Sequence, residues 1–203
     1  MKLYYFPGAC SMAAHIALRE AGLNFDLEKV DLMGGGKTES GADYASINPK
    51  GYVPALKLDN GEVLTEVGVV MQYIADQKPG SGLAPAAGTM ERYRLMEMLN
   101  FITSELHKNF TPLFNPAASA EAKEGASANI KKRLAYLNDQ LAGKQYLLGD
   151  AFTVADAYLA TILGWCQFVK FDISGYPNIG AFAGRVMGRP SVQETMKAEG
   201  LMG

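Results

Sequence analysis

The sequence predicts a small α/β domain followed by an all-helical domain. Segments typical of strands and helices alternate up to residue 77, whereas beyond residue 89 apolar residues recur only at helical spacing. Residues 79–85, with the sequence PGSGLAP, have the proline and glycine content of a linker. We therefore assign residues 1–78 to the α/β domain, 79–88 to the linker and 89–203 to the helical domain. A chain of 203 residues is long enough for two such domains.

In the first domain, each predicted element has a local signal. Aromatic residues favour a strand at 3–6, and Pro7 and Gly8 stop it. A stripe of apolar residues then predicts a helix that ends near Gly22. A second strand is predicted at 25–32, and it is parallel to the first if the helix crosses over between them. The remaining predicted elements are a loop at 34–37, a strand beginning near Pro54, a hairpin turn at 59–61 leading into a strand at 63–65, and a helix at 66–77.

In the second domain, helices are expected at 89–110, 124–141 and 153–168. Thr153 and Asp156 form a variant of the capping box, and the helix behind them is apolar nearly all round, which is typical of a buried central helix. Cys166 lies in that helix and is expected to fill the core. A second capping box, Ser191 to Glu194, predicts the start of the last helix.

Composition excludes several classes of protein. The net charge is −2 and 48% of residues are hydrophobic, as in an ordinary soluble protein. Residues 131–133 are the only basic cluster, so no nucleic-acid surface is expected. Two cysteines make no disulfide framework, and Pro7 interrupts the first apolar run after four residues, too early for a secretory signal. No run is long and apolar enough to span a membrane, and we expect a cytoplasmic protein with an intact N-terminus.

Cys10 occupies the junction between the first strand and the helix that follows. The first turn of a helix leaves backbone N–H groups without intrahelical partners, and the aligned peptide dipoles favour a thiolate there. Cysteines in such positions have pKa values well below the free value of about 8.5. The alternative is a buried structural cysteine.

The position three residues after Cys10 holds Ala13 rather than a second cysteine. A disulfide formed at Cys10 therefore needs an outside thiol to resolve it. The abundant thiol of a cytoplasm is glutathione, which is the first functional hypothesis from the chemistry alone.

The segment around Pro54 is a candidate for binding a peptide-like ligand. A proline cannot donate to a strand ladder, so Pro54 belongs at the start or edge of a strand, with Val53 extended before it. A cis Val53–Pro54 bond would turn the Val53 backbone outward, where it could pair with an extended peptide; the sequence leaves the isomer open. Lys37, after three glycines, could swing over a bound anion.

Five motifs together resemble the bacterial beta-class glutathione S-transferases, over nearly the whole chain. They are residues 6–11 (FPGACS), 48–56 (NPKGYVPAL), 64–66 (LTE), 105–108 (ELHK) and 152–158 (FTVADAY). The resemblance implies the glutathione transferase fold: a thioredoxin-like N-terminal domain and an all-helical C-terminal domain. It also implies a homodimer with one site at each subunit interface, glutathione as co-substrate, and no metal.

By this resemblance, Cys10 contacts the glutathione sulfur and can form a mixed disulfide with it. Val53 pairs through its backbone with the cysteinyl part of the tripeptide, and Pro54 is a cis proline. Glu66 and the backbone N–H of Val67 hold the γ-glutamyl group. Because the family usually has a small or hydroxylated residue where this chain has Val67, a hydroxyl contact is absent.

The remaining glutathione-site residues implied by the resemblance are Lys37, which matches a lysine that meets the glycyl carboxylate, and four residues of the helical domain, Asn100, Ser104, His107 and Lys108, some of which reach glutathione across the dimer interface. The charges are complementary, because glutathione carries two carboxylates and one ammonium, while Lys37, Lys108 and Glu66 supply cations and a carboxylate. His107 is assigned a catalytic role as a hydrogen-bond donor to the sulfur or a carboxylate, with a solvated or capping histidine as the alternative. His15 is expected to be structural.

The expected function is a glutathione transferase for detoxification, which stabilises the glutathione thiolate and transfers it to an apolar electrophile, alongside thiol-disulfide exchange at Cys10. Side activities as a thiol transferase, peroxidase or reductive dehalogenase are expected. The expected co-substrate pocket consists of Tyr5, Pro7, Ala9, Phe110, Phe114 and Trp165. Two alternatives remain: a dedicated glutathione-dependent reductase of disulfides or dehydroascorbate, and a non-catalytic ligand-binding or regulatory protein on the same fold. If Cys10 is structural, Tyr5 and Ser11 are the next candidates for activating the sulfur.

Overall fold

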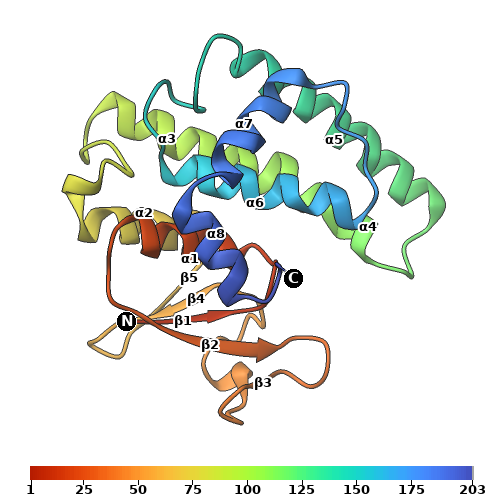
Figure 1. The fold of residues 1–203 in the computed structure, drawn as a ribbon. Coiled ribbons are helices and arrows are strands. Elements are labelled where there is room, and N and C mark those ends of the chain that lie inside the picture. Colours follow the sequence, from red (N-terminus) through yellow and green to blue (C-terminus); the bar gives the residue numbers. More distant parts are fainter. Residues whose placement is uncertain (203) are drawn as a thin grey trace. The chain divides into compact units, whose positions relative to one another are not determined.

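The computed structural model describes residues 1–202, which divide into two compact units. The first unit comprises Met1–Ala84 together with the chain from Arg189 onward, and the second comprises Pro85–Gly188. The first unit is a mixed sheet with helices and the second is all-helical (Figure 1). This confirms the predicted fold class, an α/β domain and an all-α domain.

The sheet of the first unit has five strands in the order β3-β2-β1-β4-β5. Strands β1 and β2 are parallel, and every other neighbouring pair is antiparallel. The strands are β1 (Lys2–Tyr5), β2 (Asp26–Asp31), β3 (Lys37–Thr38), β4 (Ala55–Lys57) and β5 (Val63–Thr65). The helices of this unit are α1 (Ser11–Glu20), α2 (Val67–Gln77) and α8 (Pro190–Ala198), with short 3₁₀ turns η1 (Tyr44–Ser46) and η2 (Pro79–Ser81).

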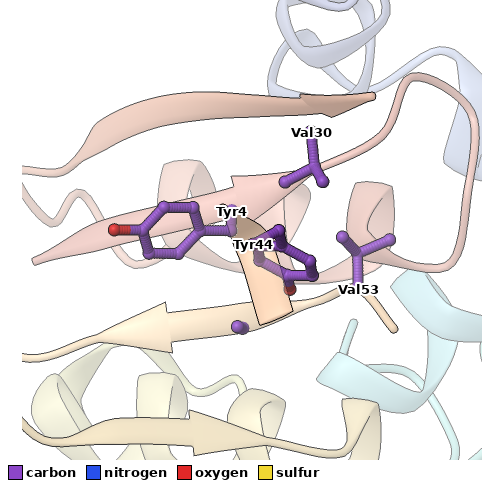
Figure 2. Packing of buried hydrophobic residues seen from close by; sticks show 5 residues of the cluster. Tyr4, Val30, Tyr44 and Val53 are labelled. Carbon is purple, nitrogen blue, oxygen red and sulfur yellow. The ribbon is translucent and has the colours of Figure 1, made fainter. Parts of the chain in front are cut away.

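Successive side chains of β1 point to opposite faces of the sheet, as the pleat requires. Tyr4 packs against Tyr44, with ring centroids 5.8 Å apart, in the cluster drawn in Figure 2. The next residue, Tyr5, lies against His15 of α1, with centroids 6.2 Å apart. Both faces of β1 are therefore covered, which explains the apolar run at residues 3–5.

Helix α8 groups with the first unit, whereas the sequence analysis assigned all of 89–203 to the helical domain. It packs on α1, and Glu20 of α1 accepts hydrogen bonds from Arg189 Nε at 2.6 Å and from Ser191 Oγ. Burial favours the protonated form of Glu20, but the hydrogen bonds from Arg189 and Ser191 outweigh it and lower the carboxyl pKa. The predicted capping box at Ser191 is wrong, because the helix begins at Pro190, whose fixed φ suits the first helical position, and Ser191 instead bonds Glu20.

The second unit is built around α6 (Val154–Phe168), which is buried along most of its length, as expected. The capping box of Thr153 and Asp156 and the burial of Cys166 are also confirmed. Its other helical segments are α3 (Met90–Phe101), the π-helical turn η3 (Ile102–Leu106), the 3₁₀ turn η4 (His107–Phe110), α4 (Thr111–Phe114), α5 (Ala120–Gln140) and α7 (Pro177–Met187). Within residues 1–202, none of the helices is both long and apolar enough to cross a membrane.

The predicted helix over 89–110 is continuous only as far as Phe101, where the hydrogen-bonding pattern changes to a π turn and then to 3₁₀. Single π turns inside helices occur frequently at functional sites. Helix α7 is not among the helices expected from the sequence, although Pro177 at its first position and the buried Ile179, Phe182 and Val186 are helix signals.

Candidate active site

Cys10 is the residue immediately before the first turn of α1, as the sequence predicts. Its side chain is buried, and the sulfur lies 3.1 Å from the carbonyl oxygen of Val53. A carbonyl oxygen can only accept, so Cys10 donates this hydrogen bond as a thiol. Formation of the thiolate requires that the bond be released.

The turn that carries Cys10 is closed by Ser11. Its hydroxyl lies 3.2 Å from both the backbone nitrogen and the carbonyl oxygen of Phe6, and the side chain is fully buried. The Ala9 N–H also donates to the Phe6 carbonyl, at 3.1 Å. Ser11 therefore shapes the loop between β1 and α1, and its hydroxyl is occupied by backbone.

The Val53–Pro54 peptide is cis, as the resemblance implies. The Val53 side chain is anchored in the cluster of Tyr4, Val30, Tyr44 and Ala55 (Figure 2). The preceding carbonyl, of Tyr52, accepts hydrogen bonds from the Tyr44 hydroxyl at 2.8 Å and from the side-chain amide of Asn48 at 2.7 Å. These contacts fix the Val53 backbone opposite Cys10.

Glu66 directly precedes α2 and adopts φ of 69°, in the left-handed region that residues with a side chain rarely occupy. Such backbone conformations cluster at functional sites. Its exposed carboxylate pairs with the Lys50 ammonium at 2.7 Å, and Lys50 also donates to Thr65 Oγ1 at 3.0 Å. Val67 is the first residue of α2 and is buried. Lys50 lies in the motif at 48–56, and its pairing with Glu66 is not evident from the sequence.

Lys37 lies in the short edge strand β3 and is exposed. The three glycines before Lys37 predict a flexible loop, whereas Lys37 pairs with Asp31 of β2. Pairing the backbone in β3 fixes where the lysine stem begins while leaving the ammonium in solvent.

Four predicted site residues of the second unit lie close together in the sequence and on one helical run. Asn100, Ser104 and Lys108 are exposed, and the Ser104 hydroxyl donates to the Asn100 carbonyl at 3.0 Å. His107 follows the π turn, and its Nδ1 lies 2.7 Å from the Tyr158 hydroxyl oxygen. Asn100 thus precedes the π turn, Ser104 lies within it, and His107 and Lys108 follow it in η4.

Burial lowers the pKa of His107 to about 4, and the neighbouring charge of Lys108 lowers it further in the same direction. The ring is therefore neutral at pH 7. A neutral imidazole still donates one hydrogen bond, so His107 can act as a donor but not as a cation.

An aromatic cluster adjoins His107. The Trp165 ring makes edge contacts with His107, Phe110 and Phe114, with centroid distances of 4.8, 5.6 and 5.4 Å. Trp165 and Phe110 are buried, whereas Phe114 is about half exposed. The structure therefore brings together the three residues of the expected co-substrate pocket that belong to the second unit.

The other three residues of that pocket, Tyr5, Pro7 and Ala9, belong to the first unit. Pro7 and Ala9 are half-buried in the loop before Cys10. Burial raises the pKa of Tyr5, with the charges of Glu199 and Glu39 acting in the same direction. The Tyr5 phenol is therefore protonated at neutral pH.

His15 is fully buried, in keeping with the structural role expected for it. Its Nδ1 lies 2.8 Å from Glu199 Oε1, and the other oxygen of Glu199 accepts from the Gly8 N–H at 2.9 Å. The sequence analysis missed Glu199, and no local signal identifies it, because its partners lie more than 180 residues away along the chain. Within residues 1–202, no group of three His, Cys, Asp or Glu side chains has the arrangement of a metal site.

Two family profiles match the chain: one described as "Glutathione S-transferase, N-terminal domain" over residues 8–77, and one as "Glutathione S-transferase, C-terminal domain" over residues 101–190. The glutathione S-transferase GstA of Escherichia coli O157:H7 is 48% identical over 201 residues, which cover 99% of this chain and all of the relative.

Two solved structures extend the comparison. A beta-class glutathione S-transferase from Sphingomonas chungbukensis is 53% identical, with a TM-score of 0.96 and full coverage of both chains. A sphingomonad glutathione S-transferase, described as complexed with glutathione, is 54% identical, with a TM-score of 0.95, covering 99% of this chain and 100% of its own.

The chain belongs to the glutathione S-transferase family, and its structural neighbours include a bacterial beta-class enzyme. The predicted family, fold and enzyme class are confirmed.

Proposed function

We propose that the protein binds glutathione beside Cys10 and uses it in two reactions, transfer to an apolar electrophile and thiol-disulfide exchange. The observation that carries the proposal is the Cys10 sulfur 3.1 Å from the Val53 carbonyl oxygen, at the cis peptide before Pro54. The contact supports the proposal because Val53 is the residue whose backbone, by the resemblance, pairs with the cysteinyl part of the tripeptide. Glutathione in the related sphingomonad structure supports the same ligand.

The rest of the glutathione site is proposed on charge and backbone geometry. The start of α2, at Val67, offers N–H groups to the α-carboxylate of the γ-glutamyl group. Glu66 accepts from its ammonium, and Lys50 holds Glu66 in place. By the family resemblance, Lys37 is the candidate for the glycyl carboxylate, and Asn100, Ser104, His107 and Lys108 of the helical domain are further candidates for contacts with glutathione.

In the transfer reaction, Cys10 acts as a thiol. Its S–H turns from Val53 to the bound glutathione sulfur and stabilises the thiolate by hydrogen bonding. The glutathione thiolate attacks an electrophilic carbon, a C–S bond forms, and the leaving group, such as a halide, departs with its electron pair. His107, a candidate by the resemblance, is neutral and can donate one hydrogen bond but carries no charge.

In the exchange reaction, Cys10 acts as a thiolate at the start of α1. It attacks the glutathione sulfur of a mixed disulfide between glutathione and another thiol, so that the S–S bond breaks, a Cys10–glutathione disulfide forms, and the other thiolate leaves and takes up a proton. A second glutathione thiolate then attacks the glutathione sulfur of that disulfide, which releases oxidised glutathione and regenerates the Cys10 thiolate. No internal cysteine follows three residues later, so an external thiol completes the cycle.

We infer an apolar, aromatic electrophile from the cluster of Phe110, Phe114 and Trp165, in which Phe114 remains about half exposed. We also propose a homodimer, supported by the exposed apolar side chains of Met90, Tyr93 and Met96 on α3. Sedimentation of the purified protein tests that assembly.

Steady-state assays of Cys10→Ala separate the two reactions. Conjugation of an aromatic halide is expected to persist at a reduced rate, because binding and the other donors remain, whereas exchange with a glutathione disulfide is expected to vanish. Loss of both reactions, with glutathione still bound, would favour a dedicated reductase. Failure of the wild type to bind a glutathione affinity column would favour a non-catalytic protein on this fold.

A further inference from the structure

We infer that Glu199, in the segment after α8, is a positioning residue that holds the Cys10 loop in its reactive shape. The inference rests on the proposed function, because it concerns the same thiol. Glu199 lies nearly two hundred residues from Cys10 in the sequence, yet its carboxylate reaches the loop between β1 and α1. Both lie in the first unit.

The contact belongs to a buried chain of hydrogen bonds. The Gly8 N–H donates to Glu199 Oε2 at 2.9 Å, and Glu199 Oε1 lies 2.8 Å from His15 Nδ1. On the other side of the ring, Arg19 Nε donates to His15 Nε2 at 3.0 Å. The side chains of His15 and Glu199 have no exposed surface.

Arg19 determines which group donates and which accepts in each of these hydrogen bonds. A guanidinium only donates, so His15 Nε2 must accept, and the proton of the neutral ring lies on Nδ1. Nδ1 therefore donates to Glu199, and so does Gly8. A group that accepts at both oxygens is an ionised carboxylate, and neither a protonated acid nor an amide can replace it without placing two donors face to face.

Gly8, the residue that donates to Glu199, has a positive φ. Gly8 adopts φ of +71°, and a Cβ added there would lie 3.5 Å from Leu201 Cδ2, in ordinary contact. The segment after α8 thus meets Gly8 with a carboxylate and an apolar side chain. Since Gly8 is two residues before Cys10, the contact bears directly on the position of the sulfur opposite Val53.

Glu199→Met removes the acceptor while keeping the length of the side chain. Glu20→Met is the matched control, because Glu20 also joins α1 to the α8 segment through Arg189 but does not contact Gly8. Each variant is measured for thermal unfolding, for the rate of Cys10 alkylation by iodoacetamide, and for the rate of mixed-disulfide formation with oxidised glutathione. All rates are taken well below the unfolding temperature.

In Glu199→Met the Cys10 loop is expected to open more often, so that the alkylation rate rises about tenfold. Loss of a hydrogen bond to a charged group is enough to shift the population of open loop by about this factor. The mixed-disulfide rate is expected to fall by about the same factor, because the thiol no longer faces a fixed glutathione site. Glu20→Met is expected to lower the unfolding temperature and leave both rates unchanged.

A second pair of variants tests the donor and acceptor roles in these hydrogen bonds. Glu199→Gln leaves one donor facing another, whereas Glu199→Gln combined with Arg19→Met lets the His15 proton move to Nε2. The amide can then donate to Nδ1 and accept from Gly8. The double variant is expected to restore the alkylation and mixed-disulfide rates toward wild type, relative to Glu199→Gln alone.

Wild-type rates in both Glu199→Met and Glu199→Gln would overturn the inference, as would equal changes in Glu20→Met. The proposed function is tested by the wild type alone, because a wild type that forms no glutathione adduct contradicts it. The iodoacetamide comparison still tests the role of Glu199 in that case, since it needs no glutathione.

Discussion

Replacing His107 by glutamine is expected to change how the stability of the protein depends on pH. Burial lowers the pKa of His107 from an ordinary 6.5 to about 4, and the charge of Lys108 adds to the effect. Glutamine has a similar reach and no titration, so the difference between wild type and variant isolates the proton of this residue.

The sign follows from proton uptake. Between pH 6.5 and about 4 the unfolded chain binds a proton at His107 and the folded chain does not, so folding stability falls as pH falls. The contribution is complete above pH 6.5 and is lost by about pH 4. The gap between the two pKa values corresponds to about 3 kcal/mol at 1.36 kcal/mol per unit.

The assay is urea unfolding of wild type and His107→Gln at one protein concentration, from about pH 7.5 to about pH 4. The stability of wild type minus that of the variant is expected to decrease by about 3 kcal/mol over this range. Titrating carboxyl groups affect both proteins and cancel in the difference. Because the chain has two histidines, the variant also assigns the imidazole resonances, and the His107 signal should titrate near pH 4.

A stability difference that stays constant over this range would refute the reasoning, because His107 would then have the same pKa in the folded and unfolded chains. An imidazole resonance of His107 that titrates near 6.5 would contradict the buried, neutral state directly.

Three further predictions follow from single contacts. Glu66→Gly is expected to be about 1 kcal/mol more stable to urea than Glu66→Ala, because glycine accepts φ of 69°, while both weaken glutathione binding equally in calorimetry; equal stability would show that the backbone there carries no strain. Asp156→Asn is expected to cost about 1–3 kcal/mol in urea unfolding, because the carboxylate accepts from the Leu147 and Thr153 N–H groups and from the Thr153 hydroxyl, and a neutral result would mean these donors find other partners. Burial raises the pKa of Cys166 to about 11, so native protein at about pH 8 should be alkylated at Cys10 alone and at both cysteines in urea, as peptide mapping can check.

Much of the fold follows from local signals in the sequence. Pro7 and Gly8 end the first strand, Cys10 precedes the helix, and Thr153 with Asp156 starts the central helix of the second unit. Each of these signals acts within a few residues, so propensity and capping suffice to read it.

The features that the sequence analysis missed depend on contacts between distant residues. Helix α8 packs with α1 because Glu20 contacts Arg189 and His15 contacts Glu199. Neither contact produces a periodic pattern in the sequence. The π turn before His107 cannot be distinguished from ordinary helix in the sequence, because the apolar spacing through Leu106 fits both. Lys50 reaches Glu66 only once the hairpin brings their segments together.

The central claim is that Cys10 is the thiol that meets glutathione, and intact-protein mass spectrometry after incubation with oxidised glutathione tests it most directly. The wild type is expected to gain one glutathione, and Cys10→Ala to gain none. An unmodified wild type that still binds glutathione would contradict the claim and leave Cys10 a structural thiol or hydrogen-bond donor. Because the Ser11 hydroxyl is occupied by the Phe6 backbone, Tyr5 would then be the next group to replace.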